Sequence, residues 1–249
     1  MSIFDTDNKM LKEICKLPDK DDWINSFIKS DKFQSILLET SKIDRSPIIL
    51  FDRNSLGEDP PRTPRQYELK RNHIDLQPFY ILDFISNNST GSIFDIGCGF
   101  NFFKKFYNIV GIDPFSLEAD INDEFNDSFA HTHANSMDNI FSINAIHFVS
   151  IVEIQKRIEN YFNLTKKNGY AYLSMNVERV LDWTYDKTKN TKNIENFYFP
   201  KNDLSSEIDS MINDALSNLD VEILLYNNKI NEIVSDSVNG NIRILVKRK

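Results

Sequence analysis

The residues whose spacing suggests chemistry lie in the run Ile93-Phe-Asp-Ile-Gly-Cys-Gly and just beyond it. Asp95 stands two residues before the first glycine of the pair Gly97 and Gly99, and Asp113 follows 18 residues after Asp95. Glycines directly after an apolar strand let the backbone turn tightly and approach a ligand that any Cβ would exclude. An acid at the end of the next apolar run is placed to accept both ribose hydroxyls. The pattern therefore predicts a nucleoside site.

The charge of the site indicates which nucleoside it takes. A dinucleotide site needs a third glycine where this chain has Phe102, because a pyrophosphate must lie on a helix N-terminus there. The carboxylate of Asp95 would repel a pyrophosphate but attract the ammonium group of an amino acid. A ligand that joins adenosine to an amino acid suits both Asp95 and Asp113, and S-adenosylmethionine is such a ligand. We therefore expect this cofactor in preference to a nicotinamide dinucleotide.

Two segments resemble motifs of a known family. Asp95-Ile-Gly-Cys-Gly resembles motif I of the class I S-adenosylmethionine-dependent methyltransferases, and Gly111-Ile-Asp113 resembles their acidic second-strand motif. Asn101 stands where the third motif glycine is usual, and it tolerates the same left-handed backbone. The resemblance covers about residues 66–249 and implies a Rossmann-like fold and a methyltransferase activity.

The resemblance also implies which residues hold the cofactor. In Ala119-Asp-Ile, Asp120 would meet the adenine amino group and the backbone amide of Ile121 would meet the ring, with Asp123 as an alternative acid. Asn144, after the fourth strand, would border the methionine end. The complete set of expected cofactor contacts is Asp95, Gly97, Cys98, Gly99, Asp113, Asp120, Ile121 and Asn144.

Short apolar runs alternate with helical segments from Gly91 onward. We expect strands at 92–96, 109–113, 139–145 and 169–175, a brief helix at 102–107 and an amphipathic helix at 151–164. This alternation predicts an α/β fold with a doubly wound, mostly parallel sheet that is covered on both faces. The last two apolar runs, 221–226 and 241–247, predict an antiparallel strand pair at the C-terminal end.

The N-terminal part has a different pattern. Apolar stripes at helical spacing in 10–17, 23–28 and 33–38 predict helices, and a proline-rich loop follows at 46–64. Residues 1–65 are thus expected to form a helical extension, and residues 66–249 the cofactor-binding domain. The segment 66–87 predicts a further helix, kinked or broken near Pro78.

His147 is the candidate catalytic residue because it follows the fourth strand, where an imidazole could act as a general base near neutral pH. The alternative is a histidine that only packs under the next helix. The sequence Asn144-Ala-Ile-His lacks the Asn-Pro-Pro-Tyr pattern of base and amide methylation, and no cysteine stands in a nucleophile position. We expect a small-molecule acceptor, with O- and N-methylation both left open.

Two further groups are candidate substrate contacts. A basic set after the proline-rich loop could face the cofactor carboxylate or an anionic acceptor, or could form a solvated face; it comprises Arg62, Arg65, Lys70 and Arg71. The aromatic-rich segment 182–200 could form a lid over the acceptor or cover the sheet edge. His131 and His133 have no other obvious ligands nearby in sequence, so no metal site is expected.

Composition limits the remaining function classes. The 249 residues carry a net charge of −8, which works against broad nucleic-acid binding. The two cysteines lie far apart, there is no run of about 18 apolar residues, and the N-terminus lacks the pattern of a signal peptide. We therefore expect a cytoplasmic protein that does not bind a membrane, and its oligomeric state stays open. The alternative to an enzyme is a non-catalytic binding or structural module that retains the methyltransferase fold.

Overall fold

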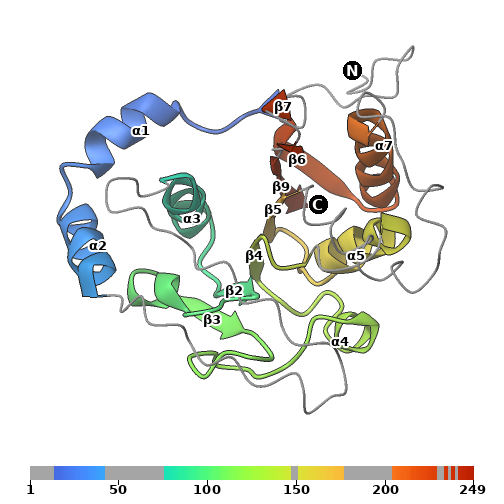
Figure 1. Cartoon of the computed structure of the whole chain (residues 1–249), viewed down its shortest axis with the longest axis horizontal. Coiled ribbons are helices and arrows are strands. Elements are labelled where there is room, and N and C mark those ends of the chain that lie inside the picture. Colours follow the sequence, from blue (N-terminus) through green and yellow to red (C-terminus); the bar gives the residue numbers. More distant parts are fainter. Residues whose placement is uncertain are drawn as a thin grey trace.

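The computed structural model describes residues 14–42, 76–146, 151–176, 204–228, 233–234, 237–238 and 241–249. Its centre is a seven-stranded mixed sheet with helices on both faces (Figure 1). The strands of this sheet are β1 (Ile14–Cys15), β2 (Ile93–Ile96), β3 (Ile109–Ile112), β4 (Asn139–Ile143), β5 (Tyr170–Asn176), β6 (Val221–Asn228) and β9 (Asn241–Arg248). Two short strands, β7 (Ile233–Val234) and β8 (Ser237–Val238), pair with each other. The predicted α/β class is confirmed.

The order of the strands creates a reversal in the middle of the sheet. The order is β1-β6-β9-β5-β4-β2-β3. From β2 the chain first adds β3 on one side and later adds β4 on the other side, and both pair parallel with β2. Open α/β sheets bind ligands beyond the carboxyl ends of the strands at such a switch point. The expected antiparallel pair is present as β6 and β9.

Helices cover both faces of the sheet and bury two apolar clusters. One cluster lies beneath α1 (Lys20–Phe27), α2 (Asp31–Lys42) and α3 (Gln77–Asn88), and the other beneath α4 (Asp127–Thr132), α5 (Ile151–Asn163) and α7 (Leu204–Ser217) (Figure 1). Ile81, Leu82 and Ile85 of α3 are fully buried. Each such side chain stabilises the fold by about 1.5–3 kcal/mol, so α3 is held firmly on its face of the sheet.

The N-terminal residues depart from the predicted helix. Ile14 and Cys15 form β1, which pairs antiparallel with Tyr226 and Leu225 of β6. The prediction of a helix at these two residues is wrong, because the edge of β6 offers backbone groups that need partners and Pro18 disfavours a helix just before it. Helices α1 and α2 do form, and they join the same buried cluster as α3. The expected boundary at residue 65 lies outside the described residues.

A carboxylate on α3 ties the N-terminal helices to the sheet. The Asp83 carboxylate accepts hydrogen bonds from the Trp23 indole (3.0 Å), the Lys32 ammonium (2.7 Å) and the Tyr107 hydroxyl (2.9 Å). Burial, and next the charge of Asp83, raise the pKa of Tyr107. The phenol therefore stays a protonated donor, and α1, α2 and the segment before β3 share one acceptor.

Pro78 lies at the beginning of a helix on this face. The described part of the predicted helix 66–87 is α3, with Pro78 in its first turn, where a missing N–H costs nothing. Residues 66–75 lie outside the described residues. Among the described helices, none is both long enough and apolar enough to span a membrane.

Candidate functional site

A left-handed glycine turn follows β2 at the switch point. Gly97 has φ +77° and Gly99 has φ +52°, a region that side-chain-bearing residues rarely adopt. A Cβ added to Gly97 would lie 2.1 Å from the Cβ of Ala145, whereas a Cβ added to Gly99 would have no atom within 4 Å. Gly97 is thus required by close packing against the segment after β4. Gly99 leaves open space through which a ligand can approach the backbone.

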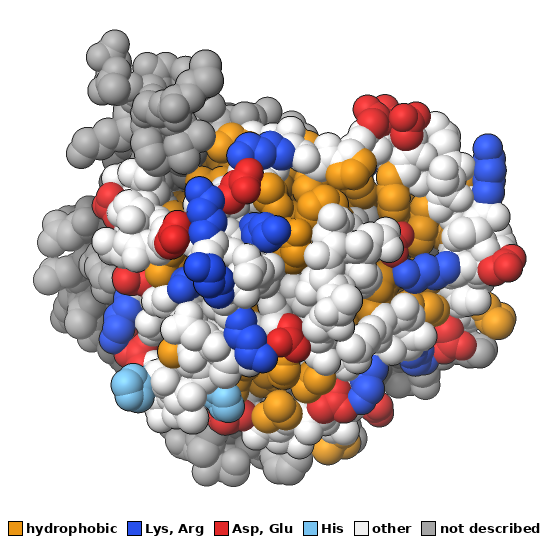
Figure 2. Space-filling view, turned by 180° about the vertical axis from the view of Figure 1, so that it is seen from behind, with side chains coloured by type: hydrophobic (Ala, Val, Ile, Leu, Met, Phe, Trp, Pro, Cys, Tyr) orange, Lys and Arg blue, Asp and Glu red, His pale blue; other side chains and the backbone are white. Residues whose placement is uncertain are grey.

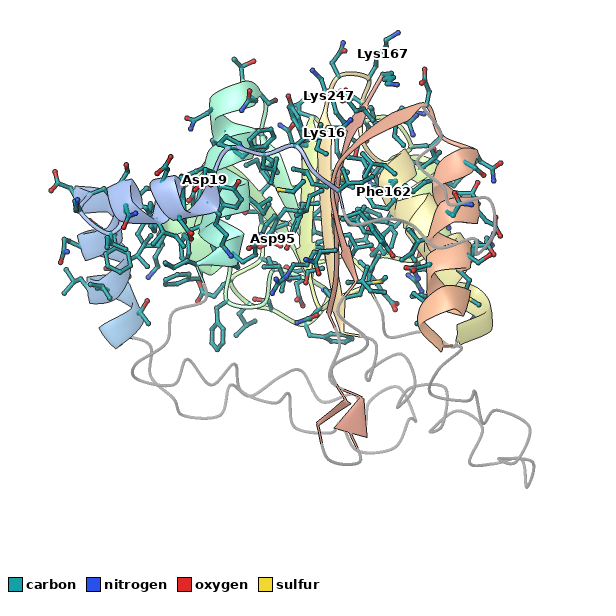
Figure 3. All side chains as sticks on the ribbon, turned by 90° about the horizontal axis from the view of Figure 1, so that it is seen from above. Lys16, Asp19, Asp95, Phe162, Lys167 and Lys247 are labelled. Carbon is teal, nitrogen blue, oxygen red and sulfur yellow. The ribbon has the colours of Figure 1, made fainter. Side chains whose placement is uncertain are left out.

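Asp95 is a buried carboxylate directly before this turn. Its side chain is 3% exposed, and Figure 3 shows it in the interior of the molecule. Within the part of the chain that the structure describes, no hydrogen bond reaches this carboxylate. Burial, and next the nearby Asp113, raise the pKa of Asp95 to about 7. A buried carboxylate without a partner is costly, so a cationic group placed beside it would stabilise it strongly.

Asp113 connects the glycine turn to the loop after β3. Its Oδ1 accepts the backbone N–H groups of Phe115 (2.8 Å) and Ser116 (3.0 Å), and its Oδ2 accepts the N–H of Gly99 (3.1 Å). A carboxylate offers about four acceptor positions, so the described residues leave one position on Oδ2 for a ligand hydroxyl.

Asp120 and Ile121 lie beside β3, where Ile121 forms an isolated parallel bridge with Ile112. The Asp120 Oδ2 accepts from the Gly111 N–H (2.9 Å) and from Asn101 Nδ2 (3.1 Å), and Oδ1 pairs with the Lys104 ammonium. The hydrogen bond from Lys104 is the main reason that the pKa of Asp120 is lowered. The N–H of Ile121 donates to the Gly111 carbonyl (3.1 Å). Both groups expected to meet adenine are therefore engaged within the chain.

Asn101 fills the space beside the glycine of β3. It has φ +49° and is 5% exposed, and its Nδ2 also donates to the Glu118 carbonyl (2.8 Å). A Cβ added to Gly111 would lie 2.5 Å from the Asn101 side chain. Sequence reasoning did not find this pairing, although a lone glycine inside a strand is a signal of close approach.

Asn144 lies at the carboxyl end of β4, across the switch point from the glycine turn. It has φ +53°, and its N–H donates to the Ser174 carbonyl on β5 (2.8 Å). Its buried Oδ1 has no hydrogen-bond partner among the described residues. A buried amide oxygen without a donor is rare in proteins, so this edge of the sheet retains an acceptor that a ligand can satisfy.

The electrostatics of the site favour a positive ligand and a protonated thiol. Burial, followed by the charges of Asp95, Asp113 and Asp120, raises the pKa of the Cys98 thiol. Because the thiolate is the reactive form, Cys98 is a poor nucleophile here. Among the described residues, no group of three His, Cys, Asp or Glu side chains is placed to hold a metal ion. The adjacent carboxylates of Asp95 and Asp113 give the site a negative charge suited to an organic cation.

The two histidines of α4 and its end lie apart from this site. His131 is exposed, and the ring of His133 packs on Phe129 with 4.4 Å between centroids. His147, the basic set at 62–71 and the aromatic segment 182–200 lie outside the described residues.

Comparisons with known proteins give matches among solved structures. No protein-family model matches the chain, and no curated protein matches it. An S-adenosylmethionine-dependent methyltransferase from Archaeoglobus fulgidus is 12% identical over 73% of this chain and 97% of its own, with a TM-score of 0.41. Phosphoethanolamine N-methyltransferase 2 from Haemonchus contortus is 14% identical over 70% of this chain and 52% of its own (TM-score 0.39). A geranyl diphosphate methyltransferase is 9% identical over 70% and 84% (TM-score 0.42).

Proposed function

We propose that the carboxyl edge of β2, β3 and β4 binds S-adenosylmethionine and that the chain is a methyltransferase for a small-molecule acceptor. The observation that carries the proposal is the buried Asp95 carboxylate, which has no hydrogen bond from the described residues and precedes an open glycine turn at the switch point. The cofactor carries an ammonium, a sulfonium and a single carboxylate group, so its net charge is positive. When bound, it supplies a methyl carbon activated by the sulfonium.

Each end of this cofactor has a matching group in the site. The ammonium would offset the charge of Asp95, and the remaining acceptor position of Asp113 would take a ribose hydroxyl. The Oδ1 of Asn144 offers an acceptor at the methionine end. Because Gly99 has no neighbour within 4 Å of an added Cβ, its backbone can approach the nucleoside closely. The charge of the carboxylates and the open approach at Gly99 therefore both support this cofactor.

Calorimetric titration with S-adenosylmethionine and with its demethylated product tests the proposal. Both ligands should bind, and Asp113→Ala should weaken both by about 10- to 100-fold, since a hydrogen bond to a charged group contributes about 1.5–3 kcal/mol. Asp214→Ala removes an exposed carboxylate on α7 and is the matched control. Absence of binding of both ligands at millimolar concentration would overturn the proposal.

Within this site we assign the adenine amino group to Asp123 and a positioning role to Asp120. Asp123 follows the isolated bridge at Ile121, and among the described residues its carboxylate accepts only the N–H of Glu124 (2.8 Å). The carboxylate of Asp120 is held by three groups of the chain itself. Substituting Asp123 therefore should alter base selectivity, whereas substituting Asp120 should loosen the whole loop.

The two roles predict different responses to a change of base. Asp123→Asn should reduce the preference for S-adenosylhomocysteine over its inosine analogue by about tenfold, because one hydrogen bond to a charged group is lost. Asp120→Asn should weaken both ligands to the same extent. Parallel titrations of the two ligands measure this difference. A selective loss of adenine preference in Asp120→Asn, with equal weakening of both ligands in Asp123→Asn, would assign the adenine contact to Asp120.

Chemistry at the acceptor requires a group that positions it and removes its proton. We propose His147 as that general base, with O- and N-methylation both open. A His147→Gln variant should retain cofactor affinity while transfer falls and loses its dependence on pH near neutrality. Unchanged transfer by this variant would remove His147 from the reaction.

A non-catalytic binding module is the second candidate function. This candidate is favoured because the Asp120 carboxylate and the Asp113 Oδ1 already accept hydrogen bonds from the chain itself, which leaves fewer groups for a ligand. Cofactor binding without methyl transfer to any acceptor in a metabolite extract would support this second candidate.

A further inference from the structure

Basic side chains gather at the edge of the sheet opposite the candidate cofactor site. Lys16 follows β1, Lys167 lies in the turn before β5, and Lys247 lies near the end of β9. Since β9 pairs antiparallel with β5 and β6, and β1 antiparallel with β6, these three segments meet at the amino ends of the parallel strands. Figure 3 shows Lys16, Lys167 and Lys247 together at one side of the molecule.

We call this surface the amino-edge patch. Figure 2 shows that face, with Lys and Arg side chains gathered to the left of its centre among a few acidic ones. The basic residues that the three segments contribute are Lys16, Lys166, Lys167, Lys247, Arg248 and Lys249. The whole chain is acidic, with a net charge of −8. The charge of this acidic protein is therefore unevenly distributed, with cations gathered on one face.

The carboxylate of Glu222 lies inside the patch, opposite Lys247 in the β6–β9 register and paired with Lys16. The pKa of Glu222 is lowered, first by the hydrogen bond from Lys16 and further by the charges of Lys249 and Lys247. Lys16 and Glu222 form an ion pair at 2.9 Å. Cations from the N-terminal strand and from the C-terminal strand thus act on the same carboxylate. The positive potential of the patch is shared among segments that are distant in sequence.

Part of this positive charge is left without an acidic partner. Lys166 pairs with Asp138 at 2.7 Å. The guanidinium of Arg248, by contrast, donates to the neutral amides of Asn163 and Asn135. The ammonium groups of Lys167 and Lys249 form no ion pair with any residue that the structure describes.

The ammonium of Lys247 lies over the Tyr170 ring, 5.5 Å from its centre, in a cation–π contact. Tyr170 is 5% exposed, which leaves the ring itself out of reach of a partner. An anionic partner would therefore meet the lysine ammonium and not the ring.

The features of the patch favour carboxylates over a continuous row of phosphates. Glu222 and Asp138 are interspersed among the cations and would repel an unbroken phosphate backbone. A long polyanion would also extend past the patch over the rest of a chain whose net charge is −8. None of the large exposed apolar side chains of the described residues belongs to the patch, so it offers no stacking platform for bases.

We propose that the amino-edge patch docks an acidic segment of a partner protein. This inference goes beyond the proposed methyltransferase activity, because the patch lies at the edge opposite the glycine turn. A partner held there leaves the carboxyl edge accessible to cofactor and acceptor. Discrete carboxylates on the partner pair with Lys167, Lys249 and Arg248 and avoid Glu222 and Asp138.

Fluorescence anisotropy with a labelled oligoglutamate peptide tests this surface on the full chain. The double variant Lys167→Glu/Lys249→Glu should weaken binding by about tenfold, at roughly 0.5–1 kcal/mol for each exposed charge. The control is Lys29→Glu/Lys156→Glu, which makes the same charge change at exposed positions on other faces. Binding of the wild type should weaken as salt rises, and cofactor affinity should be unchanged in both variants.

Three outcomes would overturn the proposal. Equal weakening by the patch variant and the control variant would show a response to net charge alone. Absence of peptide binding to the wild type at low salt would show that the patch does not dock acidic segments. Tighter binding of a single-stranded oligonucleotide or of phosphatidylserine vesicles than of the peptide would replace the acidic protein segment with another class of partner. Unchanged thermal melting of both variants excludes misfolding as the cause of any loss.

Discussion

Replacing Asp95 with asparagine is expected to stabilise the cofactor-free protein above neutral pH and to remove cofactor binding. The pKa of Asp95 is raised from 3.8 to about 7 by burial and by Asp113. The folded state therefore binds a proton that the unfolded state has released, and stability falls as the pH rises through this window. A pKa difference of this size corresponds to a loss of up to about 4 kcal/mol in the free energy of unfolding. Asp95→Asn should avoid this loss because its amide does not ionise.

Urea unfolding of the cofactor-free protein at about pH 5 and about pH 8 measures this effect. The wild type should lose stability between the two values, and Asp95→Asn should lose much less. Asp127→Asn changes a carboxylate whose side chain is 65% exposed and serves as the control. Parallel pH slopes of the wild type and the Asp95 variant would show that this carboxylate is not the source of the dependence.

The expected effect of Asp95→Asn on cofactor affinity is unfavourable, in contrast to its favourable effect on stability. Without the carboxylate, the ammonium of S-adenosylmethionine loses the group that offsets its charge, and affinity should fall by about 100-fold or more. A stability gain that accompanies a binding loss is expected where a costly buried charge is kept for a ligand. A variant that gains stability and also retains affinity would show that Asp95 does not meet the cofactor.

The sequence predicted the parallel strands well because their signal is local. Each of β2, β3, β4 and β5 is a short apolar run with a polar or glycine-containing turn next to one of its ends, so periodicity alone finds it. The glycine turn and its two flanking acids were found in the same way. Local pattern was sufficient wherever the determining residues are neighbours in the chain.

The sequence failed where the determining partner is distant. Ile14 and Cys15 fit a helical stripe, and they become a strand only because β6 presents an open edge more than 200 residues later. The hydrogen bonds that Asp120 accepts from Asn101 and Lys104 are likewise invisible to a motif comparison, and the assignment of Asp120 to adenine stays a prediction. A motif identifies a residue type at a position, whereas the surrounding hydrogen bonds decide whether its carboxylate is free for a ligand.

The second large effect is expected at Gly97, where the backbone of β2 meets the segment after β4. Gly97→Ala should destabilise the fold by about 2–5 kcal/mol, from about 1–2 kcal/mol of left-handed strain and about 1–3 kcal/mol of overpacking. The overpacking follows from the 2.1 Å approach of the added Cβ to the Cβ of Ala145. Urea unfolding measures the loss, and calorimetry measures the binding that remains.

Two further variants separate the strain from the clash. Gly97→Ala combined with Ala145→Gly removes the opposing methyl group, so the double variant should regain the overpacking part and show a coupling of about 1–3 kcal/mol. Gly99→Ala adds a methyl group where no atom lies within 4 Å. Its free energy of unfolding should therefore fall only by the cost of left-handed backbone strain. Its cofactor affinity should nevertheless fall, because the methyl group occupies the space assigned to the nucleoside. Additive stability changes at Gly97 and Ala145 would mean that the two segments are not in contact. Undiminished affinity in Gly99→Ala would place the ligand elsewhere, because a nucleoside cannot share that space with a side chain.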